Sequence, residues 1–325
     1  MFTLKGNEFS SLIHREFVQN FSVLETSGSL PGKFECKSKN IREENFDILF
    51  LTSDFQEDTR VEQLQDTTHV SLHFQIKGHS EADISGLKPG MGMYGGQFNL
   101  INCIDPISSF TFPKQKNYEY ICVGLKPDFF NNVLAECGAD YNKLLSNSLK
   151  GDSFSLFKTN KVINPFQFGA LRLMQDPFLS ESLKAPFLRS KVKELIFLTL
   201  NEYSEISNTD VNVIKPCDAD RLHSLKEFLQ QHYLLPQTLE KLAKDFLLNE
   251  FKLKSGFKQL FGMSVFKYIQ FLRLEHAHTL LLNGGITVGE TATLIGYESD
   301  ASFVRAFKTL YGYSPGKIRK TGKLL

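Results

Sequence analysis

The stretch FKQLFGMS at residues 257–264 returns as FKTLYGYS at residues 307–314. Phe, Lys, Leu, an aromatic residue, Gly and Ser recur in the same order after an interval of fifty residues. A solenoid needs three or more stacked units, so a single repetition does not predict a repeat array. It indicates two copies of one small structural unit.

The correspondence between the copies extends upstream of the quoted stretches. Each copy has a threonine, then an alanine, then a polar residue before its second helix; the matched pairs are Thr238 and Thr287, Ala243 and Ala292, and Asn249 and Ser299. Thr, Asn and Ser are preferred helix N-caps because their side-chain oxygens accept hydrogen bonds from free backbone amides. Thr287 and Glu290 also have the spacing of a capping box. Each copy is therefore predicted to be a short helix, a tight turn and a second capped helix.

This order of elements is the helix-turn-helix plan, and a long helix predicted over residues 265–283 separates the two units. Two second helices about 34 Å apart can enter successive turns of the major groove on one face of DNA. Residues 218–325 carry 15 Lys and Arg against 10 Asp and Glu, a net charge of +5, whereas the preceding residues carry 22 against 26. The sequence therefore predicts double-stranded DNA as the partner of the C-terminal part.

Helical periodicity separates an inward from an outward stripe on each second helix. With Leu253 and Phe257 inward on the first and Phe303 and Phe307 inward on the second, the remaining positions face outward. The residues predicted to read base edges are Phe251, Lys254, Ser255, Ala301, Ser302 and Arg305. The residues predicted to contact phosphate are Lys252, Lys258 and Lys308. The alternative is that these stripes are only solvated helix faces.

Residues from about Asp220 to Lys320 resemble the DNA-binding domain of AraC-type (AraC/XylS) transcriptional regulators. Two motifs carry the resemblance in combination: R-L-E-x-A-x-x-L-L at residues 273–281 and G-Y-S-P-x-x-x-R at residues 312–319. The stretch NEFKLKSGFKQLFG at residues 249–262 is most similar to the branch that contains regulators of siderophore uptake such as the pyochelin type. The resemblance implies a barrel-like sensor domain, a homodimer, and activation of nearby genes through RNA polymerase. It also implies base-reading residues at the positions predicted above.

Two residues depart from the family pattern. Leu247 stands in the first turn, where the family usually has Gly, whereas the second copy keeps Gly296. A left-handed conformation would cost leucine roughly 1–2 kcal/mol, so the sequence leaves open whether the first turn has a different geometry. Thr291 stands where the family usually has Ile or Leu, which predicts a slightly weaker core in the second unit.

The region from about Asn40 to Leu125 is predicted to form strands; VSLHFQI at residues 70–76, for example, alternates apolar and polar residues. Helices follow, one beginning at Pro127 and ending before Gly138. A longer helix is expected over residues 187–203, with an apolar stripe that we assign to a homodimer seam; packing on the barrel is the alternative. The predicted fold class is α+β, with a β-rich barrel-like N-terminal sensor domain and its helical annex at 1–205, a linker at 206–217, and an all-α C-terminal domain with two helix-turn-helix units joined by a long helix at 218–325.

Other classes of site have weak support. The five cysteines (Cys36, Cys103, Cys122, Cys137, Cys217) are odd in number and scattered, which argues against a disulfide scaffold or a zinc ribbon. His69 and His73 share one face of a predicted strand, but the later strands offer few further ligands, so no metal site and no cofactor are expected. No catalytic motif is found. With no long apolar segment at the start and no apolar run of about 20 residues, the expected location is the cytoplasm and no membrane span is expected.

The predicted function is therefore a sequence-specific DNA-binding transcription regulator and activator that responds to a small-molecule effector, with a siderophore as the candidate, through its N-terminal domain. One alternative is an enzyme, such as a DNA-repair alkyltransferase, fused to a DNA-binding module. That enzyme requires a reactive cysteine with clustered metal thiolates, which the scattered cysteines do not supply. Another alternative is a regulator whose N-terminal domain only forms dimers or binds protein.

Overall fold

Strands begin at the second residue of the chain, well before the predicted start near Asn40. The computed structural model describes residues 1–65, 70–87, 89–104, 107–175, 179–207, 216–261, 263–311 and 313–321. The strands are β1 (Phe2–Lys5), β2 (Ser22–Leu30), β3 (Phe34–Arg42), β4 (Phe46–Phe55), β5 (Thr59–Gln65), β6 (Val70–Lys77), β7 (His79–Ile84), β8 (Met91–Tyr94), β9 (Gln97–Asn102), β10 (Ile107–Phe112), β11 (Gln115–Leu125), β12 (Phe154–Ser155) and β13 (Lys161–Val162). The sequence missed β2 because this strand lies at a sheet edge and contains few apolar residues.

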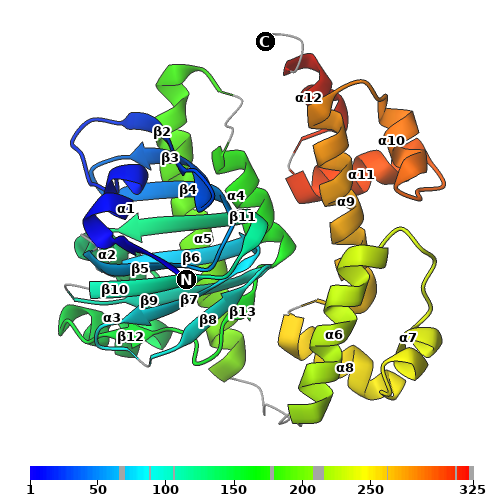
Figure 1. Cartoon of the computed structure of the whole chain (residues 1–325), viewed down its shortest axis with the longest axis horizontal. Helices are drawn as coiled ribbons and strands as arrows, with labels where there is room; N and C mark the ends of the chain where they lie inside the picture. The colour runs from blue at the N-terminus through cyan, green and yellow to red at the C-terminus, as the bar shows by residue number, and fades with distance from the viewer. Residues whose placement is uncertain are drawn as a thin grey trace. The chain divides into compact units, whose positions relative to one another are not determined.

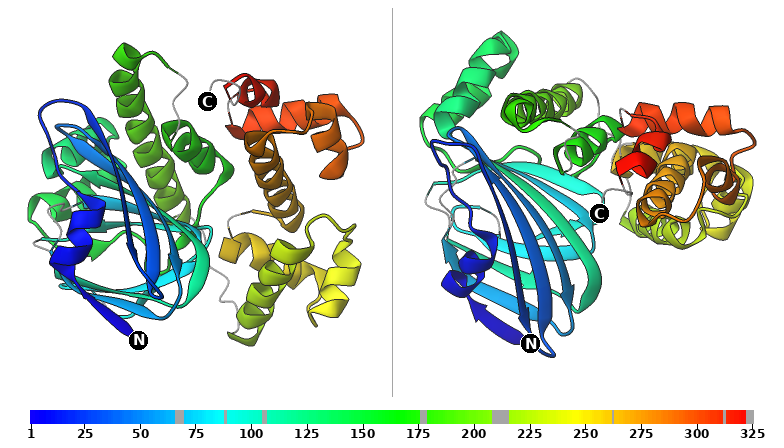
Figure 2. Two further views of the ribbon diagram at one scale, coloured as in Figure 1. Left: turned by 45° about the horizontal axis from the view of Figure 1, so that its top comes forward. Right: turned by 90° about the horizontal axis from the view of Figure 1, so that it is seen from above.

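The described strands form two sheets. One has the order β1-β5-β10-β7-β8, and the larger has the order β12-β9-β6-β11-β4-β3-β2, with β13 also paired to β9. All pairs are antiparallel except β1 with β5. The strands of the larger sheet are long and curved (Figure 2). Antiparallel sheets with alternating burial pack one face on a core, and this predicts a core between the two sheets.

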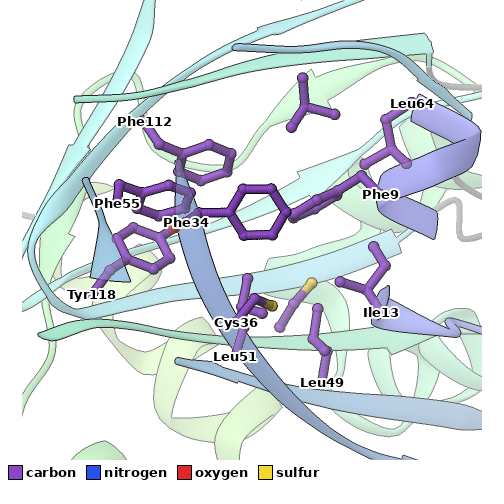
Figure 3. Close-up of a cluster of buried hydrophobic side chains, with 12 residues drawn as sticks. Phe9, Ile13, Phe34, Cys36, Leu49, Leu51, Phe55, Leu64, Phe112 and Tyr118 are labelled. Carbon is purple, nitrogen blue, oxygen red and sulfur yellow. The ribbon is translucent and has the colours of Figure 1, made fainter. Parts of the chain in front are cut away.

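An aromatic core fills the space between the sheets (Figure 3). The smaller sheet contributes Val61, Leu64 and Phe112, and the larger sheet contributes Phe34, Cys36, Leu49, Leu51, Phe55, Tyr118 and Cys122. Helix α1 (Gly6–Ile13) adds Phe9 and Ile13. Phe55 and Phe112 stack with ring centroids 4.6 Å apart, and Tyr118 meets both rings edge-on. Aromatic pairs at these distances stabilise a core beyond their buried area.

Helices α2 (Pro127–Glu136), α3 (Asn142–Leu149) and α5 (Glu181–Ser207) and the 3-10 turn η1 (Ala139–Tyr141) complete the first unit. The predicted start of α2 at Pro127 is confirmed, and Gly138 follows its end with a φ of 87°. Helix α5 is longer than predicted, and it lies alongside the strands (Figures 1 and 2).

The apolar stripe of α5 was assigned to a homodimer seam, and that assignment is wrong. Leu188, Val192, Leu195, Ile196 and Thr199 are all fully buried within the single chain. Near the end of the helix, the Tyr203 ring lies 6.5 Å from Phe157, and the Tyr141 hydroxyl donates to the Leu200 carbonyl. The stripe therefore belongs to the core, as the alternative held, because an amphipathic helix buries its apolar face against the nearest apolar sheet.

The second unit is helical: α4 (Pro165–Gln175), α6 (Pro216–His232), α7 (Leu239–Asp245), α8 (Glu250–Phe261), α9 (Val265–Asn283), α10 (Val288–Leu294), α11 (Asp300–Tyr311) and α12 (Pro315–Thr321). Chain contacts group residues 164–180 and 209–325 into this unit, and residues 1–163 and 181–208 into the first. Figure 1 shows α9 running from the α6–α8 group to the α10–α12 group. Residues 208–215 of the predicted linker lie outside the described residues, as do Gly262 and Gly312 of the two repeated stretches.

Helix α4 packs on α9 and α11, although about a hundred residues separate it from them in the chain. Its Phe168 ring meets Phe271 of α9 edge-on at 4.8 Å and lies 6.5 Å from Tyr311 of α11. A Cβ on Gly169 would stand 2.3 Å from the Leu310 carbonyl oxygen, so only glycine permits this approach. Arg172 forms an ion pair of 3.3 Å with Glu275. Helix α4 is therefore part of the core of the second unit. Among the described residues, no helix is both long enough and apolar enough to span a membrane.

Candidate nucleic-acid interface

Two helix pairs, the first α7–α8 and the second α10–α11, contain the repeated sequences. Each predicted N-cap makes its hydrogen bond. Thr238 accepts from the Lys241 amide at 3.2 Å and Asn249 accepts from the Lys252 amide at 2.7 Å. In the second pair, Thr287 accepts from the Glu290 amide at 3.1 Å and returns its own amide to the Glu290 carboxylate at 2.7 Å, and Ser299 accepts from the Ser302 amide at 3.3 Å. The predicted caps and the capping box are confirmed.

The turns inside the two pairs have the same geometry. Leu247 adopts φ 53° and Gly296 adopts φ 82°, both in the left-handed region. In the first turn, the amides of Leu247 and Leu248 donate to the carbonyls of Lys244 and Ala243. In the second turn, the amides of Gly296 and Tyr297 donate to the carbonyls of Thr293 and Ala292, at matching positions of the repeat. Leu247 therefore takes the strained conformation, and the first turn is built like the second.

The stripes predicted to face outward are exposed. On α8, Phe251, Lys252, Lys254, Ser255 and Lys258 are all exposed, and on α11 so are Ala301, Ser302, Arg305 and Lys308. The residues predicted to face inward (Leu253, Phe257, Phe303 and Phe307) are fully buried. Phe251 is 73% exposed, so its ring is accessible on the outer face of α8. The structure thus places every predicted site residue on an accessible helix face.

The charged groups of these faces have few partners within the chain. Lys252 pairs at 2.8 Å with Asp218, whose carboxylate is buried, and Lys254 pairs at the surface with Glu250 at 3.0 Å. Exposed ion pairs contribute little stability, so a base acceptor can replace the Glu250 carboxylate at small cost. Within the described part of the chain, the side chains of Lys258, Arg305 and Lys308 have no hydrogen-bond or ion-pair partner. The two serine hydroxyls are engaged: Ser255 donates to the Phe251 carbonyl, and Ser302 accepts from Ser299.

Behind the first helix pair lies a buried cation. Lys226 of α6 is buried with its ammonium 5.3 Å from the centre of the Phe261 ring. Burial lowers the pKa of Lys226 to about 8. Burial and the charge of Lys226 also lower the pKa of His223, whose ring meets Phe261 edge-on. The Lys226 ammonium faces the core and is not available to a ligand on the outer surface, whereas His223 is exposed.

Two arginines contact the turns, and the sequence assigned neither of them this role. Arg221 of α6 donates to the Leu247 carbonyl at 3.1 Å. Arg273 of α9 lies near the Gly296 carbonyl, with its Nη1 at 3.5 Å. Arg273 belongs to the R-L-E motif, but the motif alone does not reveal which distant carbonyls its side chain approaches.

The histidines considered for a metal site have other contacts. His73 hydrogen-bonds to the hydroxyls of Ser71 and Tyr120, and His69 lies outside the described residues. His278 hydrogen-bonds to the Tyr313 hydroxyl at 2.9 Å. Among the residues for which the structure gives a placement, no three His, Cys, Asp or Glu side chains come together as metal ligands. The cavity next to His73 and Tyr120 measures about 30 Å³ and is lined by both sheets.

Residues 242–321 match a family model described as a helix-turn-helix domain. The virulence regulon transcriptional activator VirF of Yersinia enterocolitica is 30% identical over 97 residues, which cover 30% of this chain and 36% of that protein. The HTH-type transcriptional regulator ExsA of Pseudomonas aeruginosa is 25% identical over 130 residues, which cover 40% of this chain and 46% of that protein. The Msm operon regulatory protein of Streptococcus mutans is 23% identical over 252 residues, covering 77% and 83%. The chain thus spans between a third and a half of the first two relatives.

Solved structures with related sequences include the C-terminal domain of AraT, a response regulator from Geobacillus stearothermophilus. It is 28% identical, covers 34% of this chain and 88% of that chain, and has a TM-score of 0.30. A probable AraC family transcriptional regulator from Rhodopseudomonas palustris is 23% identical. The match covers 32% of this chain and 97% of that chain, also with a TM-score of 0.30. TM-scores of this size establish no shared architecture on their own. The sequence matches do confirm the resemblance for the C-terminal residues, which form an AraC-type helix-turn-helix domain.

Proposed function

We propose that the chain is a sequence-specific DNA-binding transcription regulator whose two helix pairs are helix-turn-helix units, each reading one segment of the major groove. The observation that carries the proposal is the matched exposure of the two stripes. Lys254 and Arg305, both cationic and both exposed, lie on the second helix of their pair. The relatives named above are transcription regulators, which also disfavours the enzyme alternative.

In this proposal the base readers are Phe251, Lys254, Ser255, Ala301, Ser302 and Arg305. The guanidinium of Arg305 fits the two acceptors of guanine, and Lys254 can reach the same atoms. The exposed ring of Phe251 fits a thymine methyl group. Lys252, Lys258 and Lys308 contact phosphate, where a point charge contributes affinity without sequence preference.

The test is selection from randomised DNA with the wild-type chain and single variants. Arg305→Ala and Lys254→Ala should each relax base preference, at places about one helical turn apart, with losses of roughly 1–3 kcal/mol. Lys308→Ala should weaken binding to all DNA sequences alike. The salt dependence of binding should have a slope of about −0.9 for each phosphate contact. A preference unchanged by Arg305→Ala but altered by Lys254→Ala would mean that only the first pair reads bases.

The first unit is the proposed sensor. Its core contains polar groups that an apolar core does not need: Asn40 is fully buried and neither atom of its amide has a partner, and the ion pair of Arg15 with Asp47 at 2.9 Å is also buried. Unsatisfied buried polar groups are costly, and a polar ligand that bonds to them removes the cost. The cavity of about 30 Å³ beside His73 and Tyr120 is too small for a small-molecule effector, so an effector that binds at this place has to separate the sheets.

Native mass spectrometry of protein purified from its own cytosol tests the sensor. A retained small molecule supports an effector, and the mass of an iron-siderophore complex supports the siderophore branch. Protein that carries no small molecule and forms dimers supports the alternative in which the first unit only assembles. The homodimer and the contact with RNA polymerase follow from the family resemblance, and the same spectra report the oligomeric state. Because the α5 stripe is buried, the dimer seam belongs to another surface.

A further inference from the structure

The side chain of Arg273 touches backbone of the loop between α6 and α7 and backbone of the turn in the second helix pair. Arg273 lies near the middle of α9, and its Nε donates to the Tyr233 carbonyl at 2.8 Å. Its Nη2 lies 3.5 Å from the Leu234 carbonyl, and its Nη1 lies 3.5 Å from the Gly296 carbonyl. Tyr233 and Leu234 belong to the loop that enters the first pair, whereas Gly296 is in the turn of the second. One side chain on the connecting helix therefore joins the loop that leads into the first pair to the turn of the second pair.

The three acceptors lie directly after helix ends. Helix α6 ends at His232, just before Tyr233 and Leu234, and helix α10 ends at Leu294, two residues before Gly296. Carbonyls just beyond the end of a helix, like the last carbonyls of the helix itself, have no partner within the helix and lie at the negative end of its dipole. A guanidinium is a planar cation with several donors in fixed directions, so it can bind two such ends at once. Arg273 thus holds the ends of α6 and α10 at a set separation.

Gly296 makes this contact possible. A Cβ at Gly296 would lie 3.1 Å from Nη1 of Arg273, too close without a shift of the guanidinium. The first turn differs: Leu247 carries a side chain that is 74% exposed, and its carbonyl accepts from Arg221 of α6. Arg221 comes from α6, next to the first pair, and its polar partners among the described residues are Leu247 in the first turn and Asp218 in α6. Two arginines therefore bond to matching turns, but only Arg273 connects the pairs.

A groove of about 550 Å³ opens beside this contact. It is lined by Leu235 and Pro236 of the loop, by Phe266, Ile269 and Arg273 of α9, and by Tyr297 after the second turn. Gln270 of α9 also reaches across to the Tyr297 hydroxyl at 3.3 Å, but this contact holds only the second pair. An open groove provides little packing to resist a change in its width, so the arginine contacts have to resist it.

We infer that Arg273 is a positioning residue that sets the distance between the two helix pairs, and thereby the spacing of the two DNA segments that the protein accepts. The inference rests on the proposed function, in which both pairs read bases in one site. Arg273 itself does not touch DNA in this scheme. Its loss leaves the base preference of each pair intact and loosens the preference for their separation.

The experiment measures binding of the full chain to a set of duplexes. The two segments selected by the wild type are kept, and the spacer between them is shortened by one base pair or lengthened by one or two. The variants are Arg273→Met, Arg273→Lys and, as the matched control, Arg221→Met, which removes the turn contact of the first pair only. Near-UV circular dichroism checks that each variant is folded.

Wild type should favour its own spacing by about tenfold or more, because a displaced recognition helix loses at least one base contact. Arg273→Met should reduce this preference to a few-fold while the selected bases stay the same. Arg273→Lys should be intermediate, since one ammonium cannot hold both helix ends. Arg221→Met should weaken binding to the duplexes of every spacer length equally.

A folded Arg273→Met protein that keeps the full spacing preference overturns the inference. If the Met variant does not fold, the Lys variant decides in the same way. If wild type itself selects only one segment, the proposed function fails instead, and this outcome is distinct because it appears before any substitution is made.

Discussion

The turn of the first helix pair contains Leu247 at φ 53°, the turn of the second contains Gly296 at φ 82°, and both form the same two hydrogen bonds. The residue in the turn is therefore not what sets the turn. The flanking helices and their caps impose the geometry, and leucine accepts a strain of roughly 1–2 kcal/mol to satisfy them. Glycine is required only in the second turn, where Arg273 approaches.

The helices that cover the two pairs differ as well. Helix α6, which covers the first pair, lies just before it in the chain and contains the buried cation Lys226. Helix α4, which covers the second pair, comes from between β13 and α5 and buries an aromatic side chain. The two copies have the same order of helices, but different helices cover their cores. The following substitutions distinguish the contributions of the two covering helices.

The largest effect is expected for Phe168→Ala. Phe168 is 2% exposed and touches Phe271 and Tyr311, so its truncation should destabilise the second pair by about 3–5 kcal/mol. Hydrogen exchange should increase in α10 and α11 and change little in α7 and α8. Phe166→Ala on the same helix is the control, because Phe166 is 67% exposed. Equal loss of hydrogen-exchange protection in both pairs would show that the cores of the two pairs are not stabilised independently.

The next effect concerns Lys226. Because burial lowers its pKa to about 8 from an ordinary 10.5, the unfolded chain binds this proton more tightly than the folded protein. Its contribution to the free energy of unfolding is therefore unfavourable below about pH 8 and disappears as the pH rises toward 10.5. Lys226→Met should stabilise the second unit by roughly 1–3 kcal/mol at pH 7, with a smaller gain at pH 10.

Urea unfolding at pH 7, 8.5 and 10 measures this dependence. The exposed Lys241, changed to Met, is the matched control and should show no such trend. If Lys226→Met increases the free energy of unfolding by the same amount at every pH, then better packing explains the increase and removal of a buried charge does not.

Exchange of the turn residues should have asymmetric effects. Gly296→Leu should destabilise the fold by roughly 1–2 kcal/mol from backbone strain alone, and more if the guanidinium of Arg273 is displaced. Leu247→Gly should be stabilising by up to about 1 kcal/mol, since relief of strain is partly offset by the greater freedom of glycine in the unfolded chain. Thermal unfolding of both proteins tests the asymmetry, and equal and opposite shifts would exclude a role for Arg273 in it.

The smallest effect is expected for Thr291→Val. Thr291 is fully buried, and its hydroxyl donates to the Thr287 carbonyl at 2.7 Å, which already accepts from the Thr291 amide. Because no group loses its only partner, the change in the free energy of unfolding should stay within about 0.5 kcal/mol. A loss above 1 kcal/mol, measured by urea unfolding, would show that the hydroxyl compensates for the expected weakness of this core.

The helices and caps of the second unit could be predicted because each depends on residues within one turn of another. Asn249 and Ser299 needed only the next three residues to be recognised as caps, and the 3.6-residue period placed Phe257 and Phe307 inside. The exposed faces of α8 and α11 followed from the same period. Local signals of this kind survive in a single sequence.

Contacts over long sequence distances could not be predicted. Nothing near Phe168 or Gly169 indicates that they pack on Phe271 and Leu310, more than a hundred residues later. The approach of Arg273 to the Gly296 carbonyl depends on how three segments fold together. The stripe of α5 was read as a dimer seam for the same reason, because periodicity shows that a face is apolar but not which surface covers it.

The position of α4 means that the polypeptide passes between the two units three times, near residues 163, 180 and 208. The segment 218–325 is therefore not a cassette that can be cut out or exchanged whole. A hybrid joined within residues 206–217 would seat the α4 of one parent against the α9 and α11 of the other, and Gly169 and Phe168 would have to match a foreign surface. Recombination between relatives of this chain should therefore tolerate a junction there only when α4 travels with the helices that it covers.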